Sequence, residues 1–136
     1  MTQHKTRGGF TLVELLVVIF VIAIISTLSY VVLEGTRAKG RDARRLADIY
    51  MIRQALELYK DREGSYPINL PEPQQSLLGP SGRLYLSPMP SDPKTSQPYL
   101  YNLLENGGYR LIFNLERDNQ GYSAGENVII SPGDDK

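Results

Sequence analysis

An uninterrupted apolar stretch near the N-terminus constrains this 136-residue chain more than any other feature. It extends from Phe10 to Leu33, and the 19 residues from Leu15 to Leu33 carry no charge. At about 1.5 Å of rise per residue, a helix of that length measures about 28 Å, close to the hydrocarbon thickness of a bilayer. The sequence therefore predicts a membrane-spanning helix, because the core of a water-soluble domain does not need so long an apolar run.

One carboxylate, Glu14, interrupts the beginning of this stretch. A carboxylate that is held deep in a bilayer without a partner costs about 2.5–3.5 kcal/mol. The apolar stretch itself contains no lysine, arginine or histidine that would neutralise it. We therefore expect the partner of Glu14 to come from another chain.

The nine residues before the stretch have the positive charge of a targeting segment, with Lys5 and Arg7 and no acidic residue. In an ordinary signal peptide, the small residues of the cleavage site follow the apolar core. Here the small residue Gly9 precedes it, and no site of the A-x-A type follows. Cleavage after Gly9 would keep the apolar stretch on the mature chain. It would also place a new amine at Phe10, within reach of Glu14 on a neighbouring helix.

The segment from Gly9 to Ile19, GFTLVELLVVI, resembles the class III prepilin signal of type IV pilins and of the pseudopilins of type II secretion. The resemblance implies that a membrane-embedded aspartic peptidase cuts after Gly9 and methylates the new terminal residue, Phe10. It also implies that Glu14 neutralises the terminal amine of an adjacent subunit and sets the register of assembly. A plain single-pass anchor, in which Glu14 is incidental, is the simpler alternative.

Composition limits the rest of the chain to one globular domain. The 15 basic and 15 acidic residues balance, so nothing global favours nucleic acid as a partner. There is no cysteine, which excludes disulfides and thiol chemistry, and the single histidine, His4, lies in the predicted leader. We find no catalytic constellation and expect no enzyme, although a membrane-anchored enzyme is the competing class.

The charges on either side of the apolar stretch disagree with the resemblance about its orientation. The leader holds two basic residues, whereas a basic cluster of five follows the stretch: Arg37, Lys39, Arg41, Arg44 and Arg45. Counting positive charges alone would place the C-terminal side in the cytoplasm. The resemblance implies the opposite: a single pass through the inner membrane, a cytoplasmic N-terminus and an exported head that later joins a filament.

Beyond the apolar stretch, the sequence becomes polar but keeps the period of a helix. Apolar residues recur at intervals of three or four and form one stripe: Leu46, Ile49, Ile52, Leu56 and Tyr59. Gly64, with Pro67 behind it, is a typical helix stop, so we expect one helix over about residues 10–62. Gly35 and Gly40 weaken its middle, where we expect a bend or local melting.

The remainder of the head is predicted to be a loop followed by a small sheet. Residues 63–98 are rich in proline but contain apolar anchors, so we interpret them as a connecting loop packed on the helix. From Tyr109 to Leu115 apolar and outward positions alternate with period two, and Asn106–Gly107–Gly108 before them is a preferred hairpin turn. A further short strand is expected from Asn127 to Ile130.

These elements predict an α+β, pilin-like fold, in which a long N-terminal helix packs against a small antiparallel β-sheet head. One half of the helix is a membrane half and the other is amphipathic. The predicted organisation is a leader over 1–9, a transmembrane and filament-core helix over 10–33, and a head over 34–136. Within the head we expect the amphipathic helix at 39–62, the loop at 63–98 and the sheet at 99–131.

Two loop segments favour one branch of the family. Glu63–Pro67, and Asp92–Lys94 followed by Pro98–Tyr101, resemble loops of the major, G-type pseudopilin of type II secretion. The resemblance implies a structural subunit that polymerises through its N-terminal helix to drive protein secretion. A type IV pilus or competence pilin is the alternative, although many type IV pilins carry a disulfide that this chain cannot form.

The resemblance also implies the partners. They are further copies of the chain, minor pilins or pseudopilins, the prepilin peptidase, the inner-membrane assembly platform and, before assembly, membrane lipid. Nucleic acid is not an expected partner, because the basic cluster lies near the neck of the helix, where DNA would not easily reach. Anionic headgroups, or acids such as Asp118 or Asp134 on another subunit, are the favoured partners of that cluster. We interpret the tyrosines as core residues instead of a stacking surface for a ligand.

The C-terminal region offers oxygen ligands of the kind that Ca²⁺ prefers: Asp118, Asn119, Glu126 and Asp134. Major pseudopilins carry a calcium site in their C-terminal loops, so the resemblance motivates a calcium site here. The spacing matches no EF-hand, and a solvated acidic tail is the favoured interpretation. No other cofactor is expected.

Overall fold

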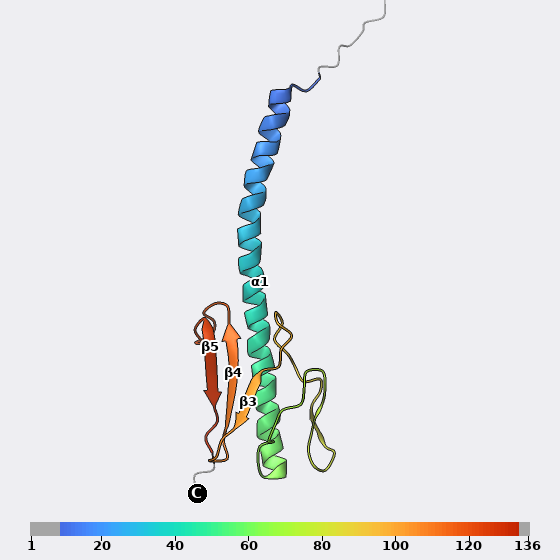
Figure 1. The fold of residues 1–136 in the computed structure, drawn as a ribbon, viewed down its shortest axis with the longest axis vertical. Coiled ribbons are helices and arrows are strands. Elements are labelled where there is room, and N and C mark those ends of the chain that lie inside the picture. The colour runs from blue at the N-terminus through green and yellow to red at the C-terminus, as the bar shows by residue number, and fades with distance from the viewer. Residues whose placement is uncertain (1–8, 134–136) are drawn as a thin grey trace, which may run out of the picture. The chain divides into compact units, whose positions relative to one another are not determined.

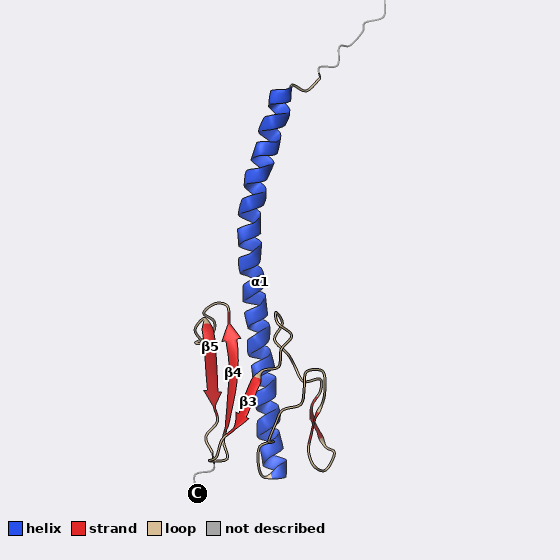
Figure 2. Ribbon diagram, in the orientation of Figure 1, coloured by secondary structure: helices blue, strands red, loops and turns tan. Residues whose placement is uncertain are grey.

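The computed structural model describes residues 9–133, except the side chains of residues 28, 29 and 31. Within that range the chain forms one helix and five strands: α1 (Leu12–Glu63), β1 (Leu77–Leu78), β2 (Leu84–Leu86), β3 (Leu100–Leu103), β4 (Tyr109–Leu115) and β5 (Gly125–Ile130) (Figures 1 and 2). The chain divides into two compact units between Arg37 and Ala38, which we describe separately. The predicted α+β fold, with one long N-terminal helix and small antiparallel sheets, is confirmed.

Helix α1 is continuous over 52 residues, close to the predicted span of 10–62. It ends at Gly64, whose φ of +84° suits glycine and whose N–H donates to the carbonyl of Lys60 at 2.9 Å. Gly35 and Gly40 lie inside the helix without interrupting it, so the expectation of local melting is wrong. Each glycine costs about 1 kcal/mol relative to alanine, and neighbours with high helix propensity, such as Ala38, offset that cost.

The first unit is the part of α1 up to Arg37. It is mostly apolar and exposed, and it makes α1 long and apolar enough to cross a membrane. The hydroxyl groups of Thr27 and Thr36 donate to the carbonyls of Ala23 and Val32, four residues earlier, at 2.9 and 3.0 Å. The hydroxyl groups of these threonines are therefore satisfied within the helix.

The head contains a three-stranded antiparallel sheet in the order β3-β4-β5. Along β4 the side chains alternate as predicted, with Tyr109, Leu111, Phe113 and Leu115 buried. The turn between β3 and β4 is closed by hydrogen bonds, and Gly107 within it has a φ of +78°. A one-residue slip would have exposed the buried face, so burial excludes it, and the closed turn fixes the register among the pairings that remain.

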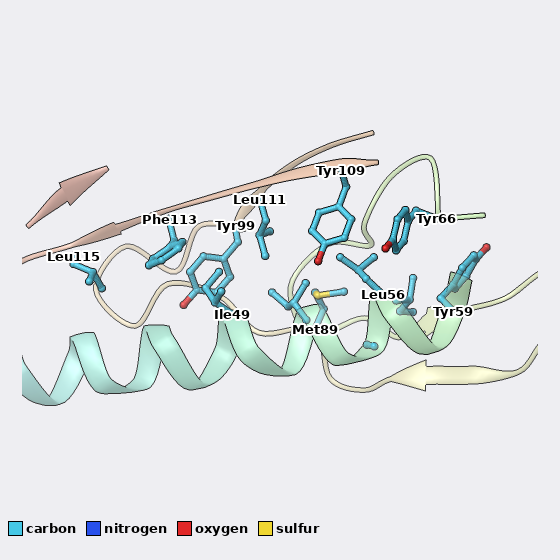
Figure 3. Close-up of a cluster of buried hydrophobic side chains, with 13 residues drawn as sticks. Ile49, Leu56, Tyr59, Tyr66, Met89, Tyr99, Tyr109, Leu111, Phe113 and Leu115 are labelled. Atoms are coloured by element: carbon cyan, nitrogen blue, oxygen red, sulfur yellow. The ribbon is translucent and has the colours of Figure 1, made fainter. Parts of the chain in front are cut away.

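The core of the head lies between α1 and this sheet (Figure 3). Four residues of the predicted helix stripe are buried and Leu46 is half-buried; the buried four are Ile49, Ile52, Leu56 and Tyr59. The rings of Tyr66 and Tyr109 meet edge to face, with centroids 4.8 Å apart. The interpretation of the tyrosines as core holds for these residues, but it is wrong for Tyr50, which is 61% exposed.

The proline-rich segment between α1 and β3 contains a small two-stranded sheet, β1–β2, which the sequence did not predict. Strands of two and three residues are too short for periodicity to indicate. Leu77 of β1 is buried in the core, and the hydroxyl of Tyr85 in β2 donates to Glu63 Oε1 at 2.6 Å. The segment is therefore packed on the head, as expected, and is fastened to the end of α1.

Candidate functional site

Gly9 and Phe10 precede α1 in exposed backbone that belongs to no helix or strand. A Cβ atom built on Gly9 would meet no other atom within 4 Å, and its φ is not in the left-handed region. Within residues 9–133, neither the backbone nor the packing therefore requires a glycine at position 9. A requirement for glycine at that position would have to come from another molecule that recognises it.

Thr11 and Glu14 form a capping box at the beginning of α1. Glu14 Oε2 accepts hydrogen bonds from the backbone N–H and the hydroxyl of Thr11 at 2.9 and 3.0 Å, and the Glu14 N–H donates to the Thr11 hydroxyl at 3.2 Å. The expectation that Glu14 finds no partner in its own chain is therefore wrong for hydrogen bonds. The Thr-x-x-Glu spacing was the signal that sequence reasoning missed. These bonds satisfy the carboxylate but supply no positive charge.

The basic cluster divides into an internal and an exposed part. Arg45 is 3% exposed, and Arg41 makes two hydrogen bonds of 2.7 Å to Glu116 in the same chain. Lys39 and Arg44 are exposed. The interpretation that the cluster serves headgroups or another subunit is therefore wrong for Arg41 and Arg45.

Arg45 is the centre of a buried ion network that joins three segments of the head. Its guanidinium group lies 2.6 Å from Asp92, 2.7 Å from Asp42 and 2.8 Å from Glu116. Asp42, which is fully buried, also accepts the backbone N–H groups of Glu116 and Arg117 at 2.9 and 3.0 Å. The network therefore fastens the loop around Asp92 and the end of β4 to the helix.

The network shifts the pKa values of its acids. The hydrogen bonds from Arg41 hold the pKa of Glu116 well below its usual range, although burial acts in the opposite direction, and Arg45 adds to the effect. Burial raises the pKa of Asp92, but hydrogen bonds from Arg45 and from N–H groups of its own loop outweigh it and bring the pKa to about 2. Both acids are therefore ionised at neutral pH.

A second polar pair, Asp48 and Tyr99, lies buried beneath the same loop. The hydroxyl of Tyr99 donates to Asp48 Oδ2 at 3.0 Å. Burial raises the pKa of Asp48, and the hydrogen bond from Tyr99 opposes that shift. Burial, together with the charge of Asp48, raises the pKa of Tyr99. The Asp92 and Tyr99 segments that carry the loop resemblance thus connect the loop to the helix.

Sequence reasoning did not find these pairings. Asp92 and Glu116 lie 47 and 71 residues from Arg45 in the chain, so no local pattern connects them. The one local signal is the spacing of three between Asp42 and Arg45, which favours an ion pair on one helix face.

Three of the four residues predicted as calcium ligands lie in or directly after one loop, and the fourth lies outside the described residues. Asp118 lies in the β4–β5 loop, where its Oδ1 accepts the N–H of Ala124 at 2.7 Å. Asn119 lies in the same loop, Glu126 lies in β5, and Asp134 falls outside the described residues. Between residues 9 and 133 no group of three or more Asp, Glu, His or Cys side chains could hold a metal ion. A calcium site in this loop would therefore need Asn119 and main-chain carbonyls beside the described carboxylates, and it stays a prediction.

Comparison with known proteins gives two kinds of similarity. The prokaryotic N-terminal methylation motif matches residues 4–30. The chain is 30% identical to type II secretion system core protein G of Klebsiella pneumoniae, over 84% of this chain and 87% of the relative. It is 28% identical to the protein of that name from Escherichia coli (strain K12), over 82% and 83% of the two chains, and 26% identical to that of Vibrio cholerae, over 96% and 94%. No solved structure gives a significant match.

Proposed function

The chain belongs to the family of type II secretion system core protein G, and from this membership we propose that it is the structural subunit of a secretion pseudopilus. The observation that carries the proposal is the similarity to these relatives over more than four fifths of both chains, which includes the head as well as the N-terminal motif. The relatives are named as a core protein of a secretion system, which agrees with a structural role instead of an enzymatic one. No observation on the described residues favours a type IV pilus or competence pilin.

The first step of the proposal is maturation at Gly9 and Phe10. A prepilin peptidase cleaves after Gly9 and methylates the amine of Phe10. The match to the N-terminal methylation motif supports this step, and so does the exposed, non-helical backbone at both residues. Recognition by the peptidase would also explain the glycine at position 9, which the packing of the described residues does not require.

The second step is assembly through Glu14. Before assembly, the chain spans the inner membrane once, with the N-terminus in the cytoplasm and the head outside. Within the bilayer an unpaired Glu14 costs about 2.5–3.5 kcal/mol, and the Thr11 hydrogen bonds leave its charge unneutralised. The terminal amine of Phe10 on an adjacent subunit supplies that charge, so pairing favours the filament over the lipid. The assembly platform and minor pseudopilins are the further partners in this proposal.

The intact mass and the N-terminal peptide of the protein from its native membrane test maturation. We expect loss of residues 1–9 and one added methyl group on Phe10. A chain that still begins at Met1, in cells that process other prepilins, would overturn this step.

A Glu14→Gln variant separates maturation from assembly. The amide oxygen can still accept the Thr11 hydrogen bonds, so the helix start is preserved while the charge is lost. We expect normal cleavage and a large decrease in the amount of subunit recovered in sheared filaments. A Glu105→Gln variant, at an exposed position in the β3–β4 turn, is the matched control. Filaments of Glu14→Gln at the control level would contradict the proposed role.

A further inference from the structure

Helix α1 carries a second apolar face in the head, opposite to the face that is buried in the core. The residues of this outer helix stripe share one side of the helix, and four of the five are apolar: Ala47, Tyr50, Met51, Gln54 and Leu58. At about 100° per residue, they lie on the far side of the helix from Ile52 and Leu56. All five are exposed, Tyr50 by 61% and Leu58 by 47%. The outward face of a helix is normally charged or polar, so this stripe is suited to contact with a partner.

The outward face of the three-stranded sheet also carries apolar residues, between the polar Asn102, Arg110, Asn114 and Glu126. Leu100, Ile112 and Val128 are direct cross-strand neighbours, and Ile130 follows in the next row beside Arg110. Leu100 and Ile130 are 60% and 58% exposed. We call Leu100, Ile112, Val128 and Ile130 the outer sheet face. The core side chains lie between α1 and β4 (Figure 3), so the outer sheet face points away from the helix.

The charges beside the two surfaces are complementary when two heads point in the same direction. The bonds from the β4–β5 loop to Asp42 place that loop beside the beginning of the head's helix. At this end of the head, Arg44 precedes the helix stripe and Glu126 adjoins the sheet face. At the opposite end, Asp61 and Arg62 both follow the stripe and pair with each other at 3.5 Å, and Arg110 adjoins the sheet face. Heads packed in the same direction bring Arg44 beside Glu126, whereas reversed heads bring Arg44 beside Arg110.

We propose that the outer helix stripe of one copy packs on the outer sheet face of a second copy that points in the same direction. Because two different surfaces meet, each pair leaves one of each surface free, and the contact continues as an open filament instead of closing into a dimer. The proposal rests on the proposed function and identifies the surfaces that the heads use. Each surface has four or five side chains, against about 20–30 residues a side in a stable interface, so it acts together with the N-terminal helices.

The absence of cysteine from the chain gives a cross-linking test without background. Met51→Cys and Val128→Cys are introduced into the full chain, alone and together, in cells that process and assemble it, and the cells are oxidised. The double variant should give a ladder of dimers, trimers and larger species. The two single variants expressed together should give dimers, and neither single variant alone should cross-link.

Two results would overturn the proposed contact. Cross-linking of Met51→Cys alone would mean that two helix stripes face each other. Filaments that contain the double variant but give no ladder would mean that the two surfaces do not meet. The matched control combines Met51→Cys with Ser81→Cys in place of Val128→Cys. Ser81 lies on an exposed loop outside both surfaces, so no ladder is expected from this pair.

Charge reversal tests the direction of packing. In the double-cysteine background, Arg44→Glu and Glu126→Arg should each reduce the ladder several-fold, and the two together should restore it. Failure of the combination to restore the ladder would contradict the same-direction arrangement.

Cleavage and the sheared filament fraction are measured in the same cells, so the two proposals fail in distinguishable ways. An uncut chain or an absence of filaments overturns the proposed function and this contact with it. Processed filaments without cross-links overturn the contact alone.

Discussion

Arg45 is the residue on which the helix, the Asp92 loop and the end of β4 converge. A buried ion pair is often no more stabilising than an apolar pair of the same volume, because both charges lose their hydration. Replacement of only one partner of the pair has a different effect, because the remaining charge stays buried without a partner. The contribution of Arg45 is therefore visible mainly when it is replaced.

Replacement of Arg45 by methionine should lower the free energy of unfolding by about 3–5 kcal/mol, because Asp42 and Asp92 lose the hydrogen bonds of the guanidinium group. Lys39→Met, at an exposed position of the same helix, is the matched control and should change it by less than about 0.5 kcal/mol. Thermal unfolding of the full chain in detergent, followed by circular dichroism, measures both. Equal stability of the two variants would contradict the central role of Arg45.

Calcium binding by the C-terminal loops remains a prediction, and Asp118 is the residue to test. If Asp118 and main-chain carbonyls of its loop hold Ca²⁺, millimolar Ca²⁺ should raise the unfolding temperature more than Mg²⁺ does, because Ca²⁺ tolerates irregular oxygen sites better. Asp118→Asn should abolish the difference. Identical unfolding curves with the two ions would leave the solvated acidic tail as the correct interpretation.

At the scale of elements, the sequence predicted what local patterns control. The helix stripe, the Gly64 stop and the alternation along β4 depend on residues close together in the chain, and the structure has them as predicted. The β1–β2 pair and the partners of Arg45 depend on segments far apart in sequence. Glu14 is an intermediate case. The Thr-x-x-Glu spacing indicates a capping box, but the apolar residues around Glu14 led to the prediction of a partner on another chain instead.

Two glycines at opposite ends of the head's part of α1 should respond oppositely to alanine. Gly64 has a φ of +84°, which alanine adopts only with strain, so Gly64→Ala should destabilise the head by about 1 kcal/mol. Gly40 lies within the helix, and a Cβ there meets no atom within 4 Å, so Gly40→Ala should stabilise it by about 1 kcal/mol. Thermal unfolding of both variants measures the difference. A stabilising Gly64→Ala would contradict the assignment of the helix stop.

At the scale of the whole head, the ion network makes the free energy of unfolding depend on pH in the acidic range. Asp92 and Glu116 have lower pKa values in the folded state than their ordinary values of 3.8 and 4.5, so the unfolded chain binds more protons as the pH falls. Their contribution is complete above about pH 4.5 and is lost as the pH falls through about 2, the folded pKa of Asp92. Asp48, whose pKa is raised, acts in the opposite sense and offsets part of the loss.

We therefore expect the unfolding temperature of the full chain in detergent to decrease steeply between about pH 4.5 and pH 2. In Glu116→Gln the decrease over this range should be smaller, because one of the two titrating groups is gone. Tyrosine fluorescence suits the measurement, since the chain has nine tyrosines and no tryptophan. A curve that is flat over this range would show that the network contributes nothing to folding.

The ion network of Arg45 with Asp42, Asp92 and Glu116 also affects the compartments in which such a subunit can fold. Many exported domains of this size are held by disulfides, which need an oxidising compartment and an enzyme that forms them. A head fastened by guanidinium and carboxylate groups folds at any redox potential, so cells that keep their envelope reducing could export it without such an enzyme. Reductants that reach the cell surface would leave the filament intact, and strong acid would weaken it.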